Sequence, residues 1–240
     1  MTMQTKRVAI LGGTSGIGQA IAAAVLAEGG TPLVVSRNPE SVAETCRRLG
    51  PAAQGFTANL TSEREIADLF SRIGPVDHLA FTAGEPLLLQ PLAEMDLAAA
   101  HLFLETRFWG AITAAKHAIP VLAPGGSITF TSGSASDRPP GAGWALGAGI
   151  CAAMQGLTRA LAIELAPLRV NLVSPGFVRT PLWREIESEA RETLFATAGA
   201  KLPVGRIGLP EEIAQAYLFL MQSGFTTGET LVLDGGGRLV

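Results

Sequence analysis

Residues Arg7–Gly18 read RVAILGGTSGIG, in which the apolar run Val8–Leu11 leads directly into a glycine-rich turn. The helix-like stretch Gln19–Leu26 follows without a break. A buried strand that ends in such a turn at a helix N-terminus forms a phosphate cradle, because glycine admits a close anion and free N–H groups favour negative charge. The spacing G-x-x-x-G-x-G departs from the usual dinucleotide fingerprint. The turn could therefore also be a tight strand–helix connection alone.

The composition indicates one domain, residues 1–240, with a large apolar core. Hydrophobic residues make up 48% of the chain and charged residues only 16%, so other elements or partner subunits must cover much of each element. A net charge of −3 argues against a nucleic-acid partner. Cys46 and Cys151 lack metal or redox spacing, which predicts no metal site and a reducing compartment. We expect a cytoplasmic protein without signal peptide or membrane span.

Strand-like and helix-like segments alternate along the whole chain, which predicts a parallel sheet with helices on both faces. After the first strand, the expected strands are Pro32–Ser36, Gln54–Ala58, Val76–Phe81, Ser127–Thr131, Arg169–Val173 and Thr230–Leu233. Helix starts are predicted at Asn38-Pro39 and at the capping box Ser62-x-x-Glu65. Longer helices are expected over Leu92–Phe103, Glu105–Leu122 and Ala145–Ala166.

Several short motifs, in this order and spacing, resemble those of the short-chain dehydrogenase/reductase family over nearly the whole length. They are Gly12-x-x-x-Gly16-Ile17-Gly18, Thr82-Ala83-Gly84, Arg169-Val170-Asn171, Ser174-Pro175-Gly176 with Thr180, Gly205-Arg206-Ile207-Gly208-x-Pro210, and Asp234-Gly235-Gly236. The resemblance implies a doubly wound, Rossmann-type α/β fold with a seven-stranded sheet in the order 3-2-1-4-5-6-7. It also implies a nicotinamide cofactor and a homotetramer or homodimer.

The cofactor half of the resemblance can be followed residue by residue. Ser36-Arg37 stands where an acidic residue would bind the ribose of NAD, so the arginine favours NADP; alternatively Arg37 is a solvated turn residue. Asn59-Leu60 stands where the family has an aspartate near the adenine. Thr180 is expected at the nicotinamide or phosphate, or as a helix cap. The implied cofactor residues are Gly12, Thr14, Ser15, Gly16, Ile17, Gly18, Ser36, Arg37, Asn59, Leu60, Ala83, Gly84, Pro175, Gly176, Val178 and Thr180.

The catalytic half departs from the family pattern, which is a Tyr-x-x-x-Lys pair on one helix face, a serine before it and an asparagine one helix earlier. Aligned through Gly156–Pro167, the tyrosine position holds Gly147 and the lysine position Cys151. The chain's one tyrosine, Tyr217, lies in a late apolar helix where packing is expected. No lysine lies on the helix of Gly147: they are Lys6, Lys116 and Lys201.

The remaining catalytic candidates are Ser134, which a gapless count places at the serine position, and Arg107 at the asparagine position. Ser132 is the alternative serine. Arg107 could polarise a carbonyl or bind an acidic ligand, or it could form an ion pair at the helix surface or at an interface. Cys151 could transfer a proton, although a small buried residue needs no further role. His78, His101 and His117 are scattered and form no ligand set.

These observations lead to an NADP(H)-dependent oxidoreductase that acts on a small carbonyl or alcohol with a non-standard proton donor. The alternative is a catalytically inactive NADP(H)-binding homologue with a regulatory or structural role. A weaker possibility is a non-redox enzyme that uses an enlarged pocket. Gly147 and its small neighbours fit either close packing against a partner helix or such a pocket, filled by Trp144 or a bulky ligand.

Overall fold

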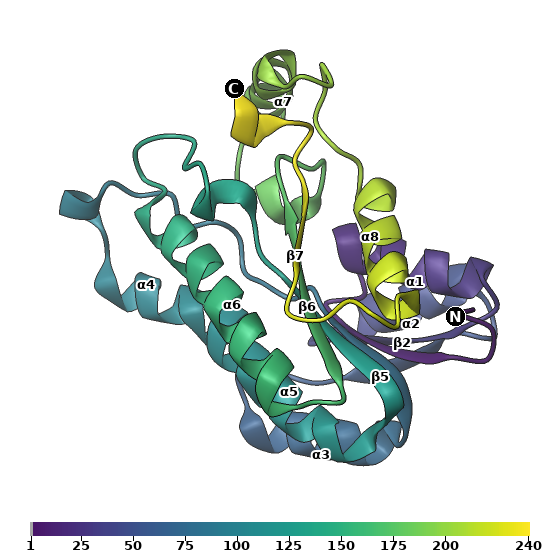
Figure 1. Cartoon of the computed structure of the whole chain (residues 1–240). Coiled ribbons are helices and arrows are strands. Elements are labelled where there is room, and N and C mark those ends of the chain that lie inside the picture. Colours follow the sequence, from purple (N-terminus) through teal and green to yellow (C-terminus); the bar gives the residue numbers. More distant parts are fainter. Residues whose placement is uncertain (1) are drawn as a thin grey trace.

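The computed structural model describes residues 2–240 and contains one parallel sheet in the order β3-β2-β1-β4-β5-β6-β7 (Figure 1). This is the expected fold class and strand order. The strands are β1 (Arg7–Leu11), β2 (Thr31–Ser36), β3 (Gln54–Thr57), β4 (Val76–Phe81), β5 (Leu122–Thr131), β6 (Arg169–Pro175) and β7 (Thr230–Leu233). Strands β5 and β6 are longer than their apolar runs, because β5 begins before the Pro124–Gly126 turn and β6 continues through Pro175.

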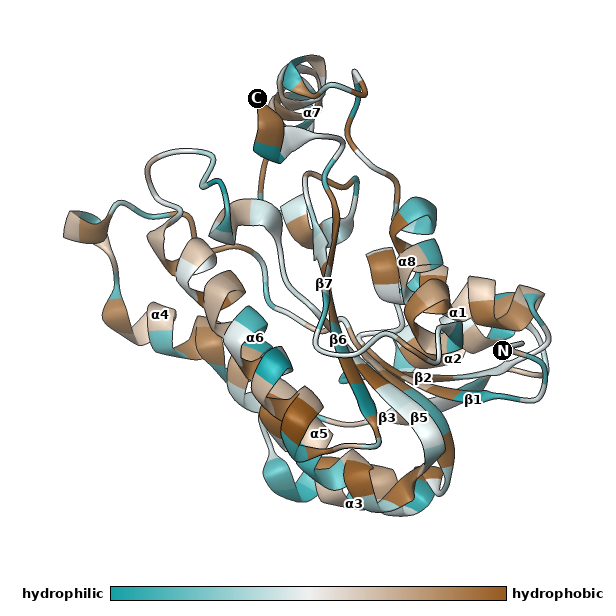
Figure 2. Ribbon diagram, viewed as in Figure 1, coloured by the Kyte–Doolittle hydropathy of each residue, from teal (hydrophilic) through white to brown (hydrophobic). Residues whose placement is uncertain are grey.

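The α-helices cover both faces of the sheet. They are α1 (Gly16–Ala27), α2 (Pro39–Leu49), α3 (Glu63–Ile73), α4 (Leu97–Leu104), α5 (Ala111–Ala118), α6 (Ala145–Glu164), α7 (Ser188–Lys201) and α8 (Pro210–Gln222). One core packs α3, α5 and α6 against one face, and a second packs α1 and α8 against the other. Alternate residues of β1 supply both, with Ala9 and Leu11 in the first core and Val8 and Ile10 in the second. Figure 2 shows the brown, apolar strands between these layers.

The prediction of two long helices over Leu92–Phe103 and Glu105–Leu122 is wrong. A 3₁₀ turn at Leu92–Glu94 precedes α4, and a π-helical turn, Glu105–Gly110, separates α4 from α5. Asp96 starts α4, since its Oδ1 accepts from the Ala98 N–H at 2.9 Å. The π turn adds a residue to the helical path. It brings Gly110 so close to the Leu60 carbonyl oxygen that a Cβ would lie only 2.7 Å away.

Helix α6 has the length and hydropathy of a membrane-spanning helix, and within residues 2–240 no other helix does. Core helices of other proteins meet the same criterion. Here Ile150, Met154 and Thr158 face inward and α6 packs along β6. Its other face carries small exposed residues, including Gly149 and Gly156. Both cysteines are free thiols, and no group of three or more His, Cys, Asp or Glu side chains in the described chain could hold a metal ion.

Candidate functional site

A cavity of about 570 Å³ lies over the carboxyl ends of β1, β2, β4, β5 and β6. Parallel α/β sheets bind ligands at this edge, where the strand order reverses; here the reversal falls between β1 and β4. Every residue that the resemblance assigns to the cofactor lines the cavity, and so do Ser134 and Arg107. Sequence reasoning missed several further lining residues: Asn38, Ser41, Glu85, Phe103, Thr106, Phe177, Trp183 and Arg184.

The glycine turn after β1 packs directly on the end of β4. Gly12 has a φ of +90°, and a Cβ there would lie 2.7 Å from the Ala83 nitrogen. A Cβ on Gly18 would lie 2.5 Å from Oγ1 of Thr82, which donates to the Leu11 carbonyl. These positions have no room for any side chain. The turn therefore presents bare backbone to the cavity.

The N-terminus of α1 is left open toward the same cavity. Its N-cap residue, Ser15, makes no side-chain cap hydrogen bond, and no acidic residue stands in the first turn. By contrast, side chains of Asn38, Ser62 and Asp96 cap α2, α3 and α4. Uncapped N–H groups at a helix N-terminus suit an anion. The local geometry thus supports the phosphate cradle over the simple strand–helix connection.

Polar side chains surround the adenosine end of the cavity. The Arg37 side chain is 66% exposed and pairs with Glu85 at 3.1 Å. Asn59 uses its Oδ1 to accept from the Thr61 N–H and hydroxyl at 3.1 and 3.0 Å. Thr180 is the N-cap of a short 3₁₀ turn, where its Oγ1 accepts from the Leu182 N–H at 3.4 Å. The helix-cap role expected for Thr180 is therefore present, and its side chain also faces the cavity.

The two candidate serines behave differently beyond β5. The Ser132 hydroxyl donates to the Cys151 carbonyl oxygen at 3.1 Å. The Ser134 hydroxyl makes no hydrogen bond with any described residue and lines the cavity. Because Ser134 has no internal partner, its hydroxyl is the better placed of the two to meet a ligand. Cys151 lies beside them, and burial raises the pKa of its thiol.

Arg107 lies on the π turn, half-buried, and not in a surface ion pair. Its Nη2 donates to the Glu85 carbonyl oxygen, and its guanidinium carbon lies 4.7 Å from the centre of the Phe103 ring. Burial lowers the pKa of the guanidinium, while Cys151 and Glu85 oppose that shift. Arg107 therefore forms no ion pair with the described residues, and this half-buried cation lines the same cavity as Ser134.

An aromatic wall stands above Gly147. A Cβ at Gly147 would lie 3.5 Å from Cε3 of Trp144, which therefore covers that position. The Trp144 ring lies 6.3 Å from Phe177 and 6.4 Å from Trp183, and the last two rings stack at 5.2 Å. Trp183 is anchored by its indole N–H, which donates to the Val178 carbonyl at 3.0 Å. Of this wall, only Trp144 was foreseen.

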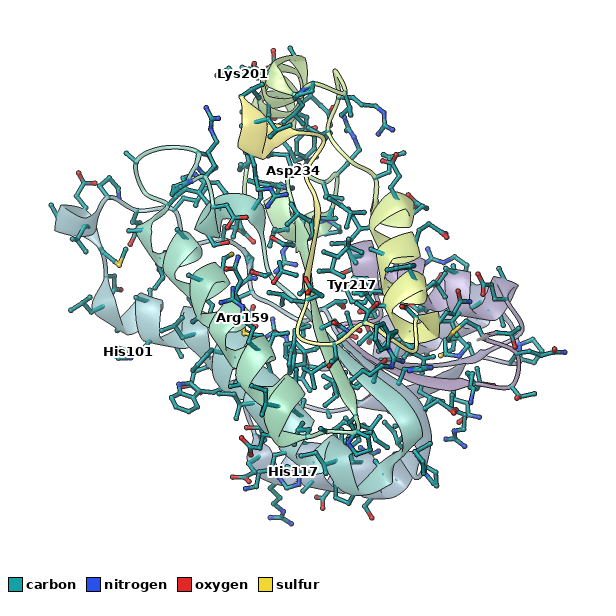
Figure 3. The ribbon with its side chains drawn as sticks, in the orientation of Figure 1. His101, His117, Arg159, Lys201, Tyr217 and Asp234 are labelled. Atoms are coloured by element: carbon teal, nitrogen blue, oxygen red, sulfur yellow. The ribbon has the colours of Figure 1, made fainter. Side chains whose placement is uncertain are left out.

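Other titratable residues lie outside the cavity. Tyr217 of α8 is fully buried (Figure 3), with its hydroxyl 2.5 Å from that of Thr131, and burial raises the pKa of its phenol. Its packing role is confirmed. Lys6 and Lys116 pair with Asp77 and Glu63 at 2.8 and 2.6 Å.

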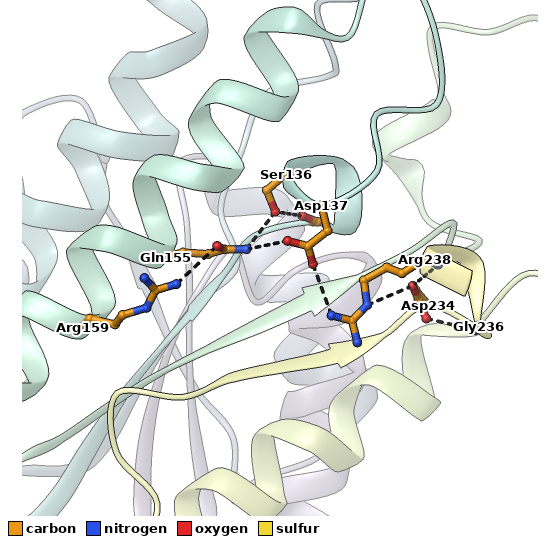
Figure 4. A network of polar contacts seen from close by, with 8 residues as sticks. Ser136, Asp137, Gln155, Arg159, Asp234, Gly236 and Arg238 are labelled. Carbon is orange, nitrogen blue, oxygen red and sulfur yellow. Dashed lines mark hydrogen bonds and ion pairs between the residues drawn. The ribbon is translucent and has the colours of Figure 1, made fainter. Parts of the chain in front are cut away.

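A polar network holds the loop that carries Ser134 (Figure 4). Asp137 accepts from Gln155 of α6 at 3.4 Å and pairs with Arg238 at 3.3 Å. Asp234 in turn accepts from the Arg238 backbone N–H at 2.9 Å. Asp137 therefore does not line the cavity, but ties the serine loop to α6 and to the C-terminal segment.

Comparisons with known proteins agree with this geometry. A family described as an SDR-like Rossmann domain matches residues 2–240. The chain is 34% identical to short-chain dehydrogenase/reductase malC of Malbranchea aurantiaca over 252 residues, covering 98% of this chain and 95% of the relative. It is 32% identical to carbonyl reductase family member 4 of Danio rerio, covering 96% and 97%.

Solved structures give the same result. A small-chain dehydrogenase in complex with NADPH matches with a TM-score of 0.83 at 32% identity, over 99% of this chain and 100% of that one. The MalC reductase/Diels-Alderase from Malbranchea aurantiaca matches with a TM-score of 0.91 at 33% identity, over 99% and 98%.

Proposed function

The chain belongs to the short-chain dehydrogenase/reductase family of oxidoreductases, and we propose that it is an NADPH-dependent reductase of a small organic substrate with a non-standard proton source. The observation that carries this proposal is a single continuous cavity. It runs from Arg37, past the bare glycine turn and the open end of α1, to Ser134 and Arg107. The similar MalC protein is a reductase/Diels-Alderase, which supports turnover rather than inactivity here.

The residues present fit an NADP(H) molecule. The glycine turn has no space for side chains, and the uncapped N-terminus of α1 offers N–H groups to a pyrophosphate. Arg37, Asn38 and Ser41 line the end of the cavity where a ribose 2′-phosphate would lie, and no acidic residue follows β2 directly. When bound, the reduced nicotinamide supplies hydride. The similar dehydrogenase solved with NADPH supports the same choice of cofactor here.

On the substrate side, the family's Tyr-x-x-x-Lys pair is replaced by Gly147 and Cys151. Ser134 holds the substrate oxygen through its unpaired hydroxyl, and Arg107 adds positive charge next to it. Neither Arg107 nor the Cys151 thiol, with its raised pKa, is a ready acid near neutral pH. Water therefore donates the proton, and a missing general acid lowers the rate by about 10²–10⁴-fold.

The test combines binding with isotope transfer. NADPH and NADH are titrated by nucleotide fluorescence, and then C4-deuterated NADPH is incubated with carbonyls and with a cationic C=N compound. We expect NADPH to bind more tightly than NADH and deuterium to appear in product. The C=N compound should react faster, because its reduced product needs no proton. Tight binding without deuterium transfer would instead establish the inactive alternative, and no binding at millimolar nucleotide would refute the cofactor.

We also propose a homotetramer or homodimer in the cytoplasm. Large apolar side chains are exposed along α4, the π turn and α6, with Leu102, Trp109 and Ile163 exposed by 68%, 55% and 81%. Exposed apolar side chains of this size support subunit contact. Light scattering after gel filtration should give two or four times the chain mass, whereas a monomer would refute this part of the proposal.

A further inference from the structure

The structure assigns to Arg107 a place in cofactor binding: we propose that its guanidinium holds the nicotinamide-ribose half of the dinucleotide. This inference rests on the proposed NADPH-dependent function and adds a residue that positions the cofactor. The cation comes from the π turn between α4 and α5, whereas Cys151 lies on α6. Cys151 is the position to which the family resemblance gives a lysine.

The first argument is the place of the guanidinium at the end of β4. A Cβ on Gly84 would lie 2.7 Å from both Cζ and Nη1 of Arg107, and 3.0 Å from Nη2. Three nearly equal distances show that the planar group faces the Gly84 backbone. A side chain at this position would displace the guanidinium from the end of β4.

The second argument is that this cation lacks partners. The Nε of Arg107 is buried without a hydrogen bond, and its Nη1 has no acceptor within residues 2–240. The nearest carboxylate, that of Glu85, pairs with Arg37 and gives Arg107 only its backbone carbonyl. A desolvated charge without a counter-ion is unfavourable. The free N–H groups therefore call for oxygen acceptors on a ligand.

The third argument is the path along the cavity. Gly12 of the phosphate turn touches Ala83, and Gly84, the next residue, touches Arg107. A dinucleotide that leaves the phosphate turn toward Ser134 must pass these two residues. The part of the molecule that follows the pyrophosphate is the nicotinamide ribose, whose hydroxyl oxygens are acceptors. A guanidinium presents several donors in a fixed plane and matches such a group.

The fourth argument is the small size of Cys151. Its Sγ would lie 3.3 Å from a Cβ on Gly133, so the thiol lies against the turn after β5 at the wall of the cavity. Arg107 and Cys151 are close enough for the charge of one to influence the pKa of the other. A lysine at 151 would place a second positive charge beside Arg107, which is unfavourable. We therefore expect one positive charge in this part of the cavity, supplied either from α6 or from the π turn.

The test uses two ligands that share the adenosine end. NADPH contains the nicotinamide ribose, whereas 2′,5′-ADP lacks it. Arg107→Met should weaken NADPH binding by about 10–100-fold, the value of a lost hydrogen bond to a charged group, and leave 2′,5′-ADP affinity unchanged. Arg107→Lys, which keeps the charge but loses the planar fork, should weaken NADPH binding less. The matched control is Arg64→Met, since Arg64 on α3 is 92% exposed.

A swap variant makes the inference specific. Arg107→Asn combined with Cys151→Lys should regain most of the NADPH affinity that Arg107→Asn alone loses, because a cation returns to the cavity from α6. Unchanged NADPH affinity in Arg107→Met, or an equal loss for both ligands, would overturn the inference. Failure of the unmodified protein to bind either ligand would instead refute the proposed function, so the two failures are distinct.

Discussion

Lowering the pH from 7.5 to 5 should remove about 2 kcal/mol of unfolding free energy through His78 alone. His78 on β4 is 4% exposed, with its Nδ1 2.9 Å from the Ser127 hydroxyl on β5. Burial lowers its pKa from 6.5 to about 4; Asp77 opposes this shift, whereas Arg169 and Lys6 add to it. The folded protein keeps the imidazole neutral at pH 5, while the unfolded chain binds a proton below pH 6.5. Stability is therefore full above that pH and falls toward pH 4.

The full shift in the pKa of His78 corresponds to about 3 kcal/mol, most of which is lost before the carboxylates of the unfolded chain titrate. Urea unfolding at a series of pH values measures it. His78→Asn places a side-chain amide near Ser127 that can form a hydrogen bond but cannot titrate. This variant should flatten the dependence of the unfolding free energy on pH between pH 7.5 and 5. The control His101→Asn changes an exposed residue of α4 and should leave the pH dependence of the unfolding free energy as it is in the unmodified protein. An equal slope in the unmodified protein and in His78→Asn would refute the reasoning.

Three further predictions concern the cavity. Glu85→Gln removes the ion pair that holds Arg37, so NADPH should bind about 1.4–5-fold more tightly, the value of an exposed pair, in a fluorescence titration. Gly18→Ala should destabilise the fold by about 1–3 kcal/mol in urea unfolding, because its Cβ has no room. Asp137→Asn breaks the pair with Arg238 that holds the serine loop, so kcat should fall about two- to fivefold while the Kd of NADPH is unchanged.

Matched variants separate these effects from general damage. Glu44→Gln breaks an exposed pair with Arg47 on α2 and should leave NADPH affinity as it was. Gly156→Ala adds a Cβ with nothing within 4 Å and should stabilise α6 by up to about 1 kcal/mol. If Gly18→Ala behaved like Gly156→Ala, the close packing of the glycine turn would be wrong. If Asp137→Asn weakened NADPH binding by the same factor by which it lowered kcat, the polar network would not act through the serine loop.

The sheet could be predicted from sequence because its signals are local. Most strands are short apolar runs that end at a turn, and the expected bounds of Thr230–Leu233 match β7 to the residue. The segment around α4 could not be predicted, because a π turn has no sequence pattern of its own. Its position depends on the fit of Gly110 against the Leu60 carbonyl, a contact between residues 50 apart in sequence. Propensity favours continuous helix there, and tertiary packing overrides it.

The two halves of the cavity differ in the same way. In the half of the cavity formed by the glycine turn, backbone segments approach each other at distances that only glycine permits. The residues there are therefore fixed in position, and short sequence motifs reveal the site. In the substrate half, side chains from the π turn, the serine loop and α6 reach one space, and a group on one wall can take the place of a group on another. Gly147 and Cys151 then look like losses when each position is considered alone. Trp144 lies against Gly147, and Arg107 lines the same cavity from the π turn, so the folded arrangement brings to this space groups that no single aligned position reveals.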